Sequence, residues 1–139
     1  MRNARLREAL YDPLKIIAID DNLHLRTSLQ ILLASLGQHV QTAATGDEGI
    51  VLIRQAPVDL VICDLDLQGP VNGYAIARMV AKESTRHGTP YLAALSGNSQ
   101  QEDRENSAVA GFDRHLGKPF NVQDLEELIA EVRRHRLRK

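Results

Sequence analysis

Five short β-like runs alternate with helix-like stretches along most of this chain, and that alternation constrains the fold more than any other feature. The runs lie near residues 15–19, 39–43, 58–63, 90–95 and 112–116. Short runs of this kind, each followed by a helical pattern, are typical of a parallel sheet with helices on both faces. The sequence therefore predicts an α/β fold with five strands.

Most of the helix-like stretches carry a clear apolar stripe. In the first, the stripe follows a capping residue, Asp21 or Asn22, and ends before Gly37; it consists of Leu25, Leu29, Leu32, Leu33 and Leu36. Further helices are predicted at 46–55, at 73–86 and from Asn121 onward. The fourth stretch is the weakest, because 99–107 contain no large apolar residue and only Ala108, Val109 and Ala110 are left to dock it.

Length and composition predict a single domain. The chain has 139 residues, of which 43% are hydrophobic and 25% charged, enough for one sizeable core. We place the domain at residues 14–136, after an N-terminal arm or linker at 1–13 that could also be a short helix, and before a basic tail at 137–139. No apolar stretch approaches the roughly 18–20 residues of a membrane span, and no signal peptide is evident, so we expect a soluble, cytoplasmic protein.

Charge is distributed unevenly along the sequence. Residues 16–132 carry eight Lys and Arg against sixteen Asp and Glu, whereas the two ends carry nine basic residues against two acidic ones. An acidic body argues against nucleic acid as the main ligand. Cys63 is the only cysteine, so no internal disulfide can form, and its place at the end of an apolar run predicts a small buried hydrophobe.

Polar side chains follow several of the predicted strands. Asp20 and Asp21 come directly after the first, Asp64 after the third, Ser96 after the fourth, and Lys118 closes the last. In an open α/β sheet, ligands bind at the carboxyl ends of the strands. Three carboxylates gathered there repel one another unless a cation is bound. The sequence therefore predicts a site for metal or phosphate chemistry.

With these residues the chain resembles the receiver domain of response regulators, the phospho-accepting module of two-component signalling. The resemblance covers about 15–131 and rests on Asp20-Asp21, Asp64, Ser96-Gly97 and Lys118-Pro119-Phe120, and the segment 110–120 is especially similar to receivers of hybrid sensor kinases. It implies a CheY-like, flavodoxin-like (βα)5 fold, a doubly wound five-stranded parallel sheet of strand order 2-1-3-4-5.

The resemblance also implies a mechanism. Asp64 would accept a phosphoryl group from the phosphohistidine of a sensor histidine kinase or a histidine phosphotransfer protein. Mg²⁺ or Mn²⁺ would be held by Asp21, Asp64 and the backbone carbonyl of Asp66, with Asp20 acting mainly through a water molecule.

Three further features follow from the same resemblance. Lys118 and the Ser96 hydroxyl would contact the phosphoryl oxygens. The Lys118–Pro119 peptide bond would be cis. The protein would signal through other proteins that contact the face formed by the fourth helix, fifth strand and fifth helix. We expect neither a nucleic-acid nor a membrane partner, and a homodimer stays open.

The sequence departs from the family pattern at several positions. His115 stands where many receivers carry an aromatic residue, often tyrosine, that swings inward when the aspartate is phosphorylated. With histidine there, the switch of Ser96 and His115 could be weaker, pH-sensitive or routed differently, or His115 could be a simple exposed strand residue. Asp66 and Asn98 lie two residues past Asp64 and Ser96, where they would tune the lifetime of the phosphoryl group. Gly73 follows Asp64 by nine residues rather than the usual eight.

Other interpretations of the site remain. Asp20 or Asp21 could merely cap the first helix. Asp64 and Asp66 match the paired aspartates of haloacid-dehalogenase-like phosphatases, although such enzymes usually carry the pair after their first strand. A receiver-like docking unit without phosphorylation is a third possibility, but it would normally lack one of the key residues, and none is missing here.

Overall fold

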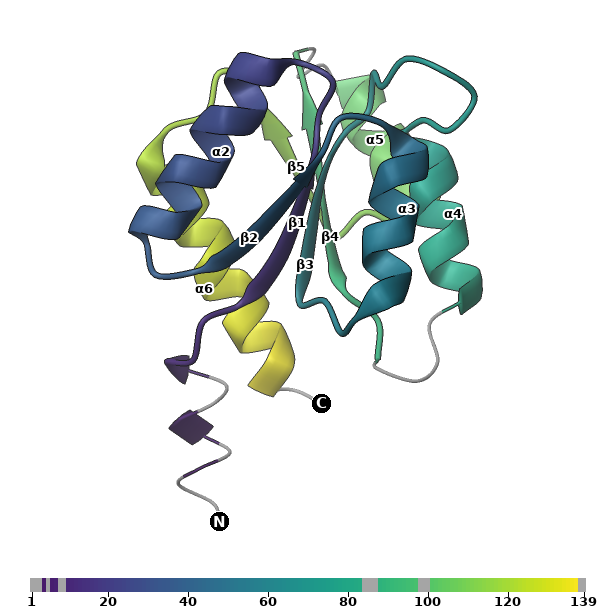
Figure 1. Ribbon diagram of the computed structural model, residues 1–139. Helices are drawn as coiled ribbons and strands as arrows, with labels where there is room; N and C mark the ends of the chain where they lie inside the picture. The colour runs from purple at the N-terminus through teal and green to yellow at the C-terminus, as the bar shows by residue number, and fades with distance from the viewer. Residues whose placement is uncertain (1–3, 5, 8–9, 84–87, 98–100, 138–139) are drawn as a thin grey trace.

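A computed structural model describes residues 4, 6–7, 10–83, 88–97 and 101–137, with the backbone alone for 101–103. Five parallel strands form one sheet of order β2-β1-β3-β4-β5 (Figure 1). This confirms the predicted fold class and strand order. The strands are β1 (Lys15–Ile19), β2 (His39–Ala43), β3 (Leu60–Asp64), β4 (Tyr91–Ser96) and β5 (Arg114–Gly117).

Helices cover both faces of the sheet, with α2 and α6 on one face and α3, α4 and α5 on the other (Figure 1). Alternate side chains of β1 supply the two cores: Ile16 and Ala18 pack on the α2 and α6 side, and Ile17 and Ile19 pack on the opposite side. The helices are α2 (Leu23–Ser35), α3 (Gly46–Gln55), α4 (Gly73–Glu83), α5 (Gln101–Ala110) and α6 (Val122–Leu137).

Capping residues set the helix ends that lie near the carboxyl edge of the sheet. The Asn22 side chain, not that of Asp21, caps α2 by accepting a hydrogen bond from the Leu25 amide at 3.1 Å. Asn121 and Asp124 exchange two hydrogen bonds at the start of α6, each side chain accepting from the other's backbone amide. These caps leave the Asp20 and Asp21 carboxylates available for other contacts.

One expectation about the fourth helix is wrong. Val109 does not dock α5, because 89% of its surface is exposed. Ala108 is exposed as well, and Ala110 is partly buried against the core. Among the α5 side chains that the structure describes, 104–110, the buried one is the polar Ser107. The apolar attachment of this helix is therefore slight.

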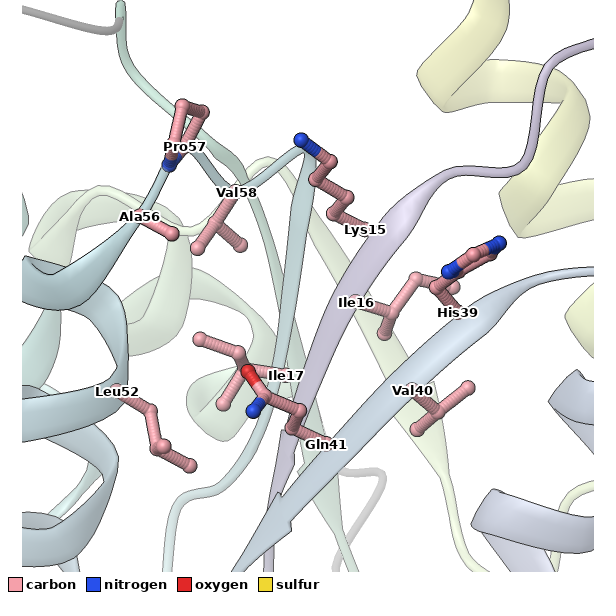
Figure 2. A pocket seen from close by; sticks show the side chains of 10 residues that line it. All are labelled: Lys15, Ile16, Ile17, His39, Val40, Gln41, Leu52, Ala56, Pro57 and Val58. Atoms are coloured by element: carbon pink, nitrogen blue, oxygen red, sulfur yellow. The ribbon is translucent and has the colours of Figure 1, made fainter.

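A surface cavity of about 390 Å³ opens between the end of α3 and the first residues of β1 and β2 (Figure 2). It is lined by Lys15, Ile16, Ile17, His39, Val40, Gln41, Leu52, Ala56, Pro57 and Val58. None of the predicted site residues lines it, because the strands begin at this end of the sheet and Asp20 and Asp64 lie at the other.

The described residues near the N-terminus form a helical turn before β1. The N-terminal residues that the structure describes, Ala4, Leu6, Arg7 and Leu10, are helical, and the Tyr11 amide continues this turn by bonding to the Arg7 carbonyl. Within the described ranges, no helix is long and apolar enough to cross a membrane.

Gly46 allows α3 to approach the loop that follows β3. A Cβ atom there would lie 2.2 Å from the carbonyl oxygen of Val71, a backbone contact that no change of rotamer relieves. We predict that Gly46→Ala lowers the free energy of unfolding by about 1–3 kcal/mol, despite the higher helix propensity of alanine. Urea denaturation measures the change.

Gly97→Ala is the matched control, because a Cβ at Gly97 meets no atom within 4 Å among the residues described. We expect this variant to stay within roughly 0.5 kcal/mol of the native protein. Equal stability of the two variants would show that α3 and the loop are not in close contact in solution.

Candidate functional site

The ends of β1 and β3 bring three carboxylates together. The strands pair in parallel with Ile19 opposite Cys63, so Asp20 and Asp64 follow at adjacent positions of the same sheet edge. One carboxylate oxygen from each of Asp20, Asp21 and Asp64 lies within 4.8 Å of the others. The sequence placed these residues at one edge, and the structure makes them one cluster.

Backbone amides hold the two buried carboxylates of this cluster. Asp20 is 0% exposed and Asp64 is 3% exposed. Each accepts a hydrogen bond from the amide two residues further on: Asp20 Oδ1 from Asn22 at 2.8 Å, and Asp64 Oδ1 from Asp66 at 2.9 Å. The bonds fix both carboxylate groups in orientation. Asp66 contributes here through its backbone, and its side chain is exposed.

Asp21 differs from its neighbour in lying at the surface. Its Oδ2 accepts a hydrogen bond of 3.3 Å from the amide of Gln68, in the loop after β3. Arg26, in the first turns of α2, donates to the backbone carbonyl of Asp20 at 2.9 Å. Two separate contacts therefore anchor the loop between β1 and α2. The Arg26 contact could not be predicted from the sequence.

Lys118 joins the two buried carboxylates from the end of β5. Its Nζ lies 3.2 Å from Asp20 Oδ2 and 3.3 Å from Asp64 Oδ2. The backbone places it, because the Lys118 amide donates to the Ser96 carbonyl at 2.8 Å, and the Lys118–Pro119 bond is cis. Ser96 itself is buried at the end of β4, opposite Gly117.

Burial dominates the electrostatics of this cluster. Burial, aided by the charge of Asp64, raises the pKa of Asp20 above its usual range, even though the Asn22 amide and Lys118 act in the opposite direction. Burial alone would lower the pKa of Lys118, but attraction to Asp64 and Asp20 outweighs it, so that pKa is raised. Lys118 therefore stays protonated, whereas ionised Asp20 is held at a cost.

The donor set suits a divalent cation. Hard carboxylate oxygens from Asp20, Asp21 and Asp64 are the ligands that Mg²⁺ and Mn²⁺ prefer. A bound cation would also offset the unfavourable ionisation of Asp20, which the Lys118 ammonium leaves incompletely compensated. The cluster could thus hold a metal ion with its own residues.

Gly73 supports the site from the start of α4. A Cβ atom there would lie 2.8 Å from the carbonyl oxygen of Asp64 and 3.1 Å from Leu65 Cα. Only a residue without a side chain lets the helix approach the end of β3 this closely. The sequence showed the unusual spacing of this glycine but not the contact that requires it.

His115 makes a contact with α5. His115 occupies β5, and its Nδ1 lies 3.3 Å from the hydroxyl oxygen of Ser107 in α5. Asn98, predicted to influence phosphate lifetime, falls outside the described residues. Ser107 was not predicted as a contact residue. The sequence feature that could have indicated it is a polar residue at the buried position of a helix with few apolar residues.

A substitution tests the electrostatic cost at Asp20. Its pKa is higher in the folded protein than in the unfolded chain, so ionisation of Asp20 destabilises the fold as the pH rises through the interval between the two values. Asparagine cannot ionise. We therefore predict that Asp20→Asn raises the free energy of unfolding at pH 7 in a chelating buffer, measured by urea denaturation, and reduces the stabilisation that added Mg²⁺ gives the native protein.

Asp66→Asn provides the control, because the Asp66 side chain is exposed and its amide, which bonds to Asp64, is retained. We expect its stability in chelator to equal that of the native protein. A loss of stability in Asp20→Asn would contradict the assignment of Asp20 as an unfavourably buried charge.

Known proteins resemble the chain in sequence and in structure. The probable transcriptional regulator ycf27 of Porphyridium aerugineum is 32% identical over 120 residues, covering 86% of this chain and 48% of that protein. The chain spans about half the length of the curated relatives it matches. The chemotaxis response regulator CheY4 of Vibrio cholerae is 26% identical, with a TM-score of 0.78 and coverage of 86% of this chain and 98% of that one.

A more distant structure shows the same fold. The receiver domain of Ssk1 from Saccharomyces cerevisiae, crystallised with the histidine phosphotransfer protein Ypd1, has a TM-score of 0.78 at 19% identity, covering 88% of this chain and 90% of that one. The family described as response regulator receiver domain matches residues 16–130. With a match over most of its length and the expected strand order, the chain belongs to the response regulator receiver domain family of two-component signalling.

Proposed function

We propose that Asp64 accepts a phosphoryl group from the phosphohistidine of a sensor histidine kinase or a histidine phosphotransfer protein. The observation that carries this proposal is the carboxylate of Asp64, which lies 3.3 Å from the Lys118 ammonium and in one cluster with Asp20 and Asp21. A carboxylate at the end of a strand, beside a fixed positive charge and two further acids, suits acceptance of phosphate with the help of a metal ion.

The reaction moves one phosphoryl group between two proteins. A carboxylate oxygen of Asp64 forms a bond to phosphorus, the phosphorus–nitrogen bond to histidine breaks, and the nitrogen keeps the electron pair. When bound, Mg²⁺ or Mn²⁺ would neutralise charge on the phosphoryl oxygens, held by Asp20, Asp21, Asp64 and the Asp66 carbonyl.

The residues of this chain have distinct roles in the proposal. The hydrogen bond from the Asp66 amide to Oδ1 keeps the nucleophilic carboxylate in place. Lys118 supplies positive charge for the phosphoryl oxygens, and the Ser96 hydroxyl donates a hydrogen bond to them after transfer. Asp66 and Asn98 would set the lifetime of the aspartyl phosphate, and Ser96 and His115 would pass its presence to the surface.

The partners follow from the same chemistry. Ssk1, whose receiver domain has this fold, was crystallised with a phosphotransfer protein, and a donor of that class or a histidine kinase fits the site. We place the output on other proteins, through the face that α5, β5 and α6 form, with homodimerisation as one form of output. No nucleic-acid or membrane contact is part of the proposal.

Phosphorylation of Asp64 can be tested with a small donor. We predict that acetyl phosphate with Mg²⁺ labels the native chain with up to one phosphoryl group, and that Asp64→Asn lowers labelling to background because asparagine is not a nucleophile. Intact-mass spectrometry measures the label. Asp66→Asn, which keeps the acceptor, should still be labelled. Equal labelling of native protein and Asp64→Asn would mean that another residue is the acceptor.

A phosphatase would differ from a receiver in its turnover of an added phosphomonoester. A haloacid-dehalogenase-like enzyme would hydrolyse an added phosphomonoester continuously, with Asp66 as acid and base. We predict that the protein with Mg²⁺ and excess p-nitrophenyl phosphate releases no more product than a buffer control, because a receiver keeps its phosphoryl group for seconds or longer and does not turn over an added phosphomonoester. Sustained release that Asp64→Asn abolishes would favour the phosphatase.

A further inference from the structure

The strand β2 forms one edge of the sheet, where it pairs with β1 alone (Figure 1). The His39 amide donates to the Leu14 carbonyl, so the backbone groups of His39 face β1. Because backbone groups alternate in direction along a strand, those of Val40 and Thr42 face away from the sheet. No hydrogen bond joins these outward groups to another part of the chain that the structure describes. They are therefore available to a further strand.

This edge lacks the features that usually prevent strands of different chains from pairing. Such features are charged side chains, proline and bulges. The sequence of β2, His39–Ala43, contains no Lys, Arg, Asp, Glu or Pro, and its register with β1 is continuous. By contrast, the strand at the other edge, β5, begins with Arg114 and is soon followed by Pro119. The side chains of His39 and Gln41 are exposed and line the cavity shown in Figure 2, so α3 does not cover them.

Opposite charges lie at the two ends of β2. Lys15, the partner of His39 in the sheet, places an ammonium group beside the start of the strand. Asp47 and Glu48 follow the end of the strand as exposed residues of the first turn of α3, and the Glu48 carboxylate accepts a hydrogen bond from the Ala44 amide at 3.0 Å. A second β2 laid antiparallel to the first brings the basic start of each strand beside the acidic end of the other. A parallel arrangement would instead bring like charges together.

We propose that two copies of this chain associate through β2, paired antiparallel about a twofold axis at Gln41, so that the two sheets become one. Val40 of each copy exchanges both N–H···O bonds with Thr42 of the other copy, which satisfies the outward backbone groups. Because the same surface is used on both sides, the contact is isologous and closes as a dimer. The association uses the free edge of the sheet and does not depend on phosphorylation of Asp64.

A disulfide across the axis tests this geometry. The two copies of Gln41 form a non-hydrogen-bonded pair with Cα atoms about 4.5 Å apart, a separation that a disulfide spans. Oxidation by diamide, which takes up the two thiol hydrogens, should therefore cross-link Gln41→Cys roughly tenfold faster than Gln55→Cys, a control at an exposed glutamine of α3. The native Cys63 is buried and should not react. Equal cross-linking rates for the two variants would overturn the proposal.

Charge repulsion at the axis gives a second test, by sedimentation equilibrium without oxidant. We expect the native protein to form a dimer whose fraction rises with concentration. Gln41→Lys, which brings two ammonium groups together, should raise the dissociation constant roughly tenfold, whereas the neutral Gln41→Ser should stay within about threefold of the native value. Gln41 is exposed, so neither change disturbs the core. A native protein that stays monomeric up to millimolar concentration, or equal dissociation constants for the two variants, would overturn the proposal.

Amide hydrogen exchange of the native protein identifies the strand that pairs. In dilute solution the Val40 and Thr42 amides should exchange fast, because they face solvent, and in samples that sedimentation shows to be dimeric they should slow at least several-fold. The His39 amide, which bonds to Leu14 in either state, serves as the internal reference. Unchanged exchange of Val40 and Thr42 in dimeric samples would overturn the proposal, since the dimer would then form through another surface. All three measurements are made without a phosphoryl donor, so a failure of Asp64 to accept phosphate would not alter them.

Discussion

Repulsion between buried carboxylates is the constraint around which the carboxyl edge of this sheet is built. Asp20 and Asp64 follow adjacent parallel strands and are almost fully buried, so their charges meet in a medium that screens them poorly. Lys118 lies within 3.3 Å of both and compensates part of this repulsion. The raised pKa of Asp20 shows that the compensation is incomplete. Binding of a further cation at this edge is therefore expected to stabilise the folded protein.

The surrounding structure keeps these charges in place. Amides of Asn22 and Asp66 orient the two carboxylates, and Gly73 lets α4 pack directly against the backbone at Asp64. The contact between His115 and Ser107 joins β5, the strand that directly precedes Lys118, to α5. The segment formed by β5 and Lys118 thus contacts both the acid cluster and α5, the helix with little apolar contact to the core.

Much of the fold could be predicted from the sequence because its signals are local. Apolar runs located the strands to within about two residues, and the stripe from Leu25 to Leu36 located α2. The strand order came from the family resemblance, since periodicity does not say which strands are neighbours. The grouping of Asp20, Asp21 and Asp64 followed once the strands were placed side by side.

What the sequence did not show depends on contacts between distant segments. The close approach of Gly46 to Val71 is visible only when the helices are in place, and Val109 was assigned to an interface that Ser107 occupies instead. Similarly, nothing local distinguishes Arg26 from other helix arginines, although its guanidinium bonds to the Asp20 carbonyl. Tertiary packing decides such cases, and propensity contributes little.

The central claim is that the acids of β1 and β3 form one site for a divalent cation. Paramagnetic broadening by Mn²⁺, followed in the amide NMR spectrum, tests it most directly. The account predicts that substoichiometric Mn²⁺ selectively broadens the signals of residues 20–22 and 64–66, and that excess Mg²⁺ restores them. Uniform weak broadening, or broadening centred on another acidic part of the surface, would contradict it.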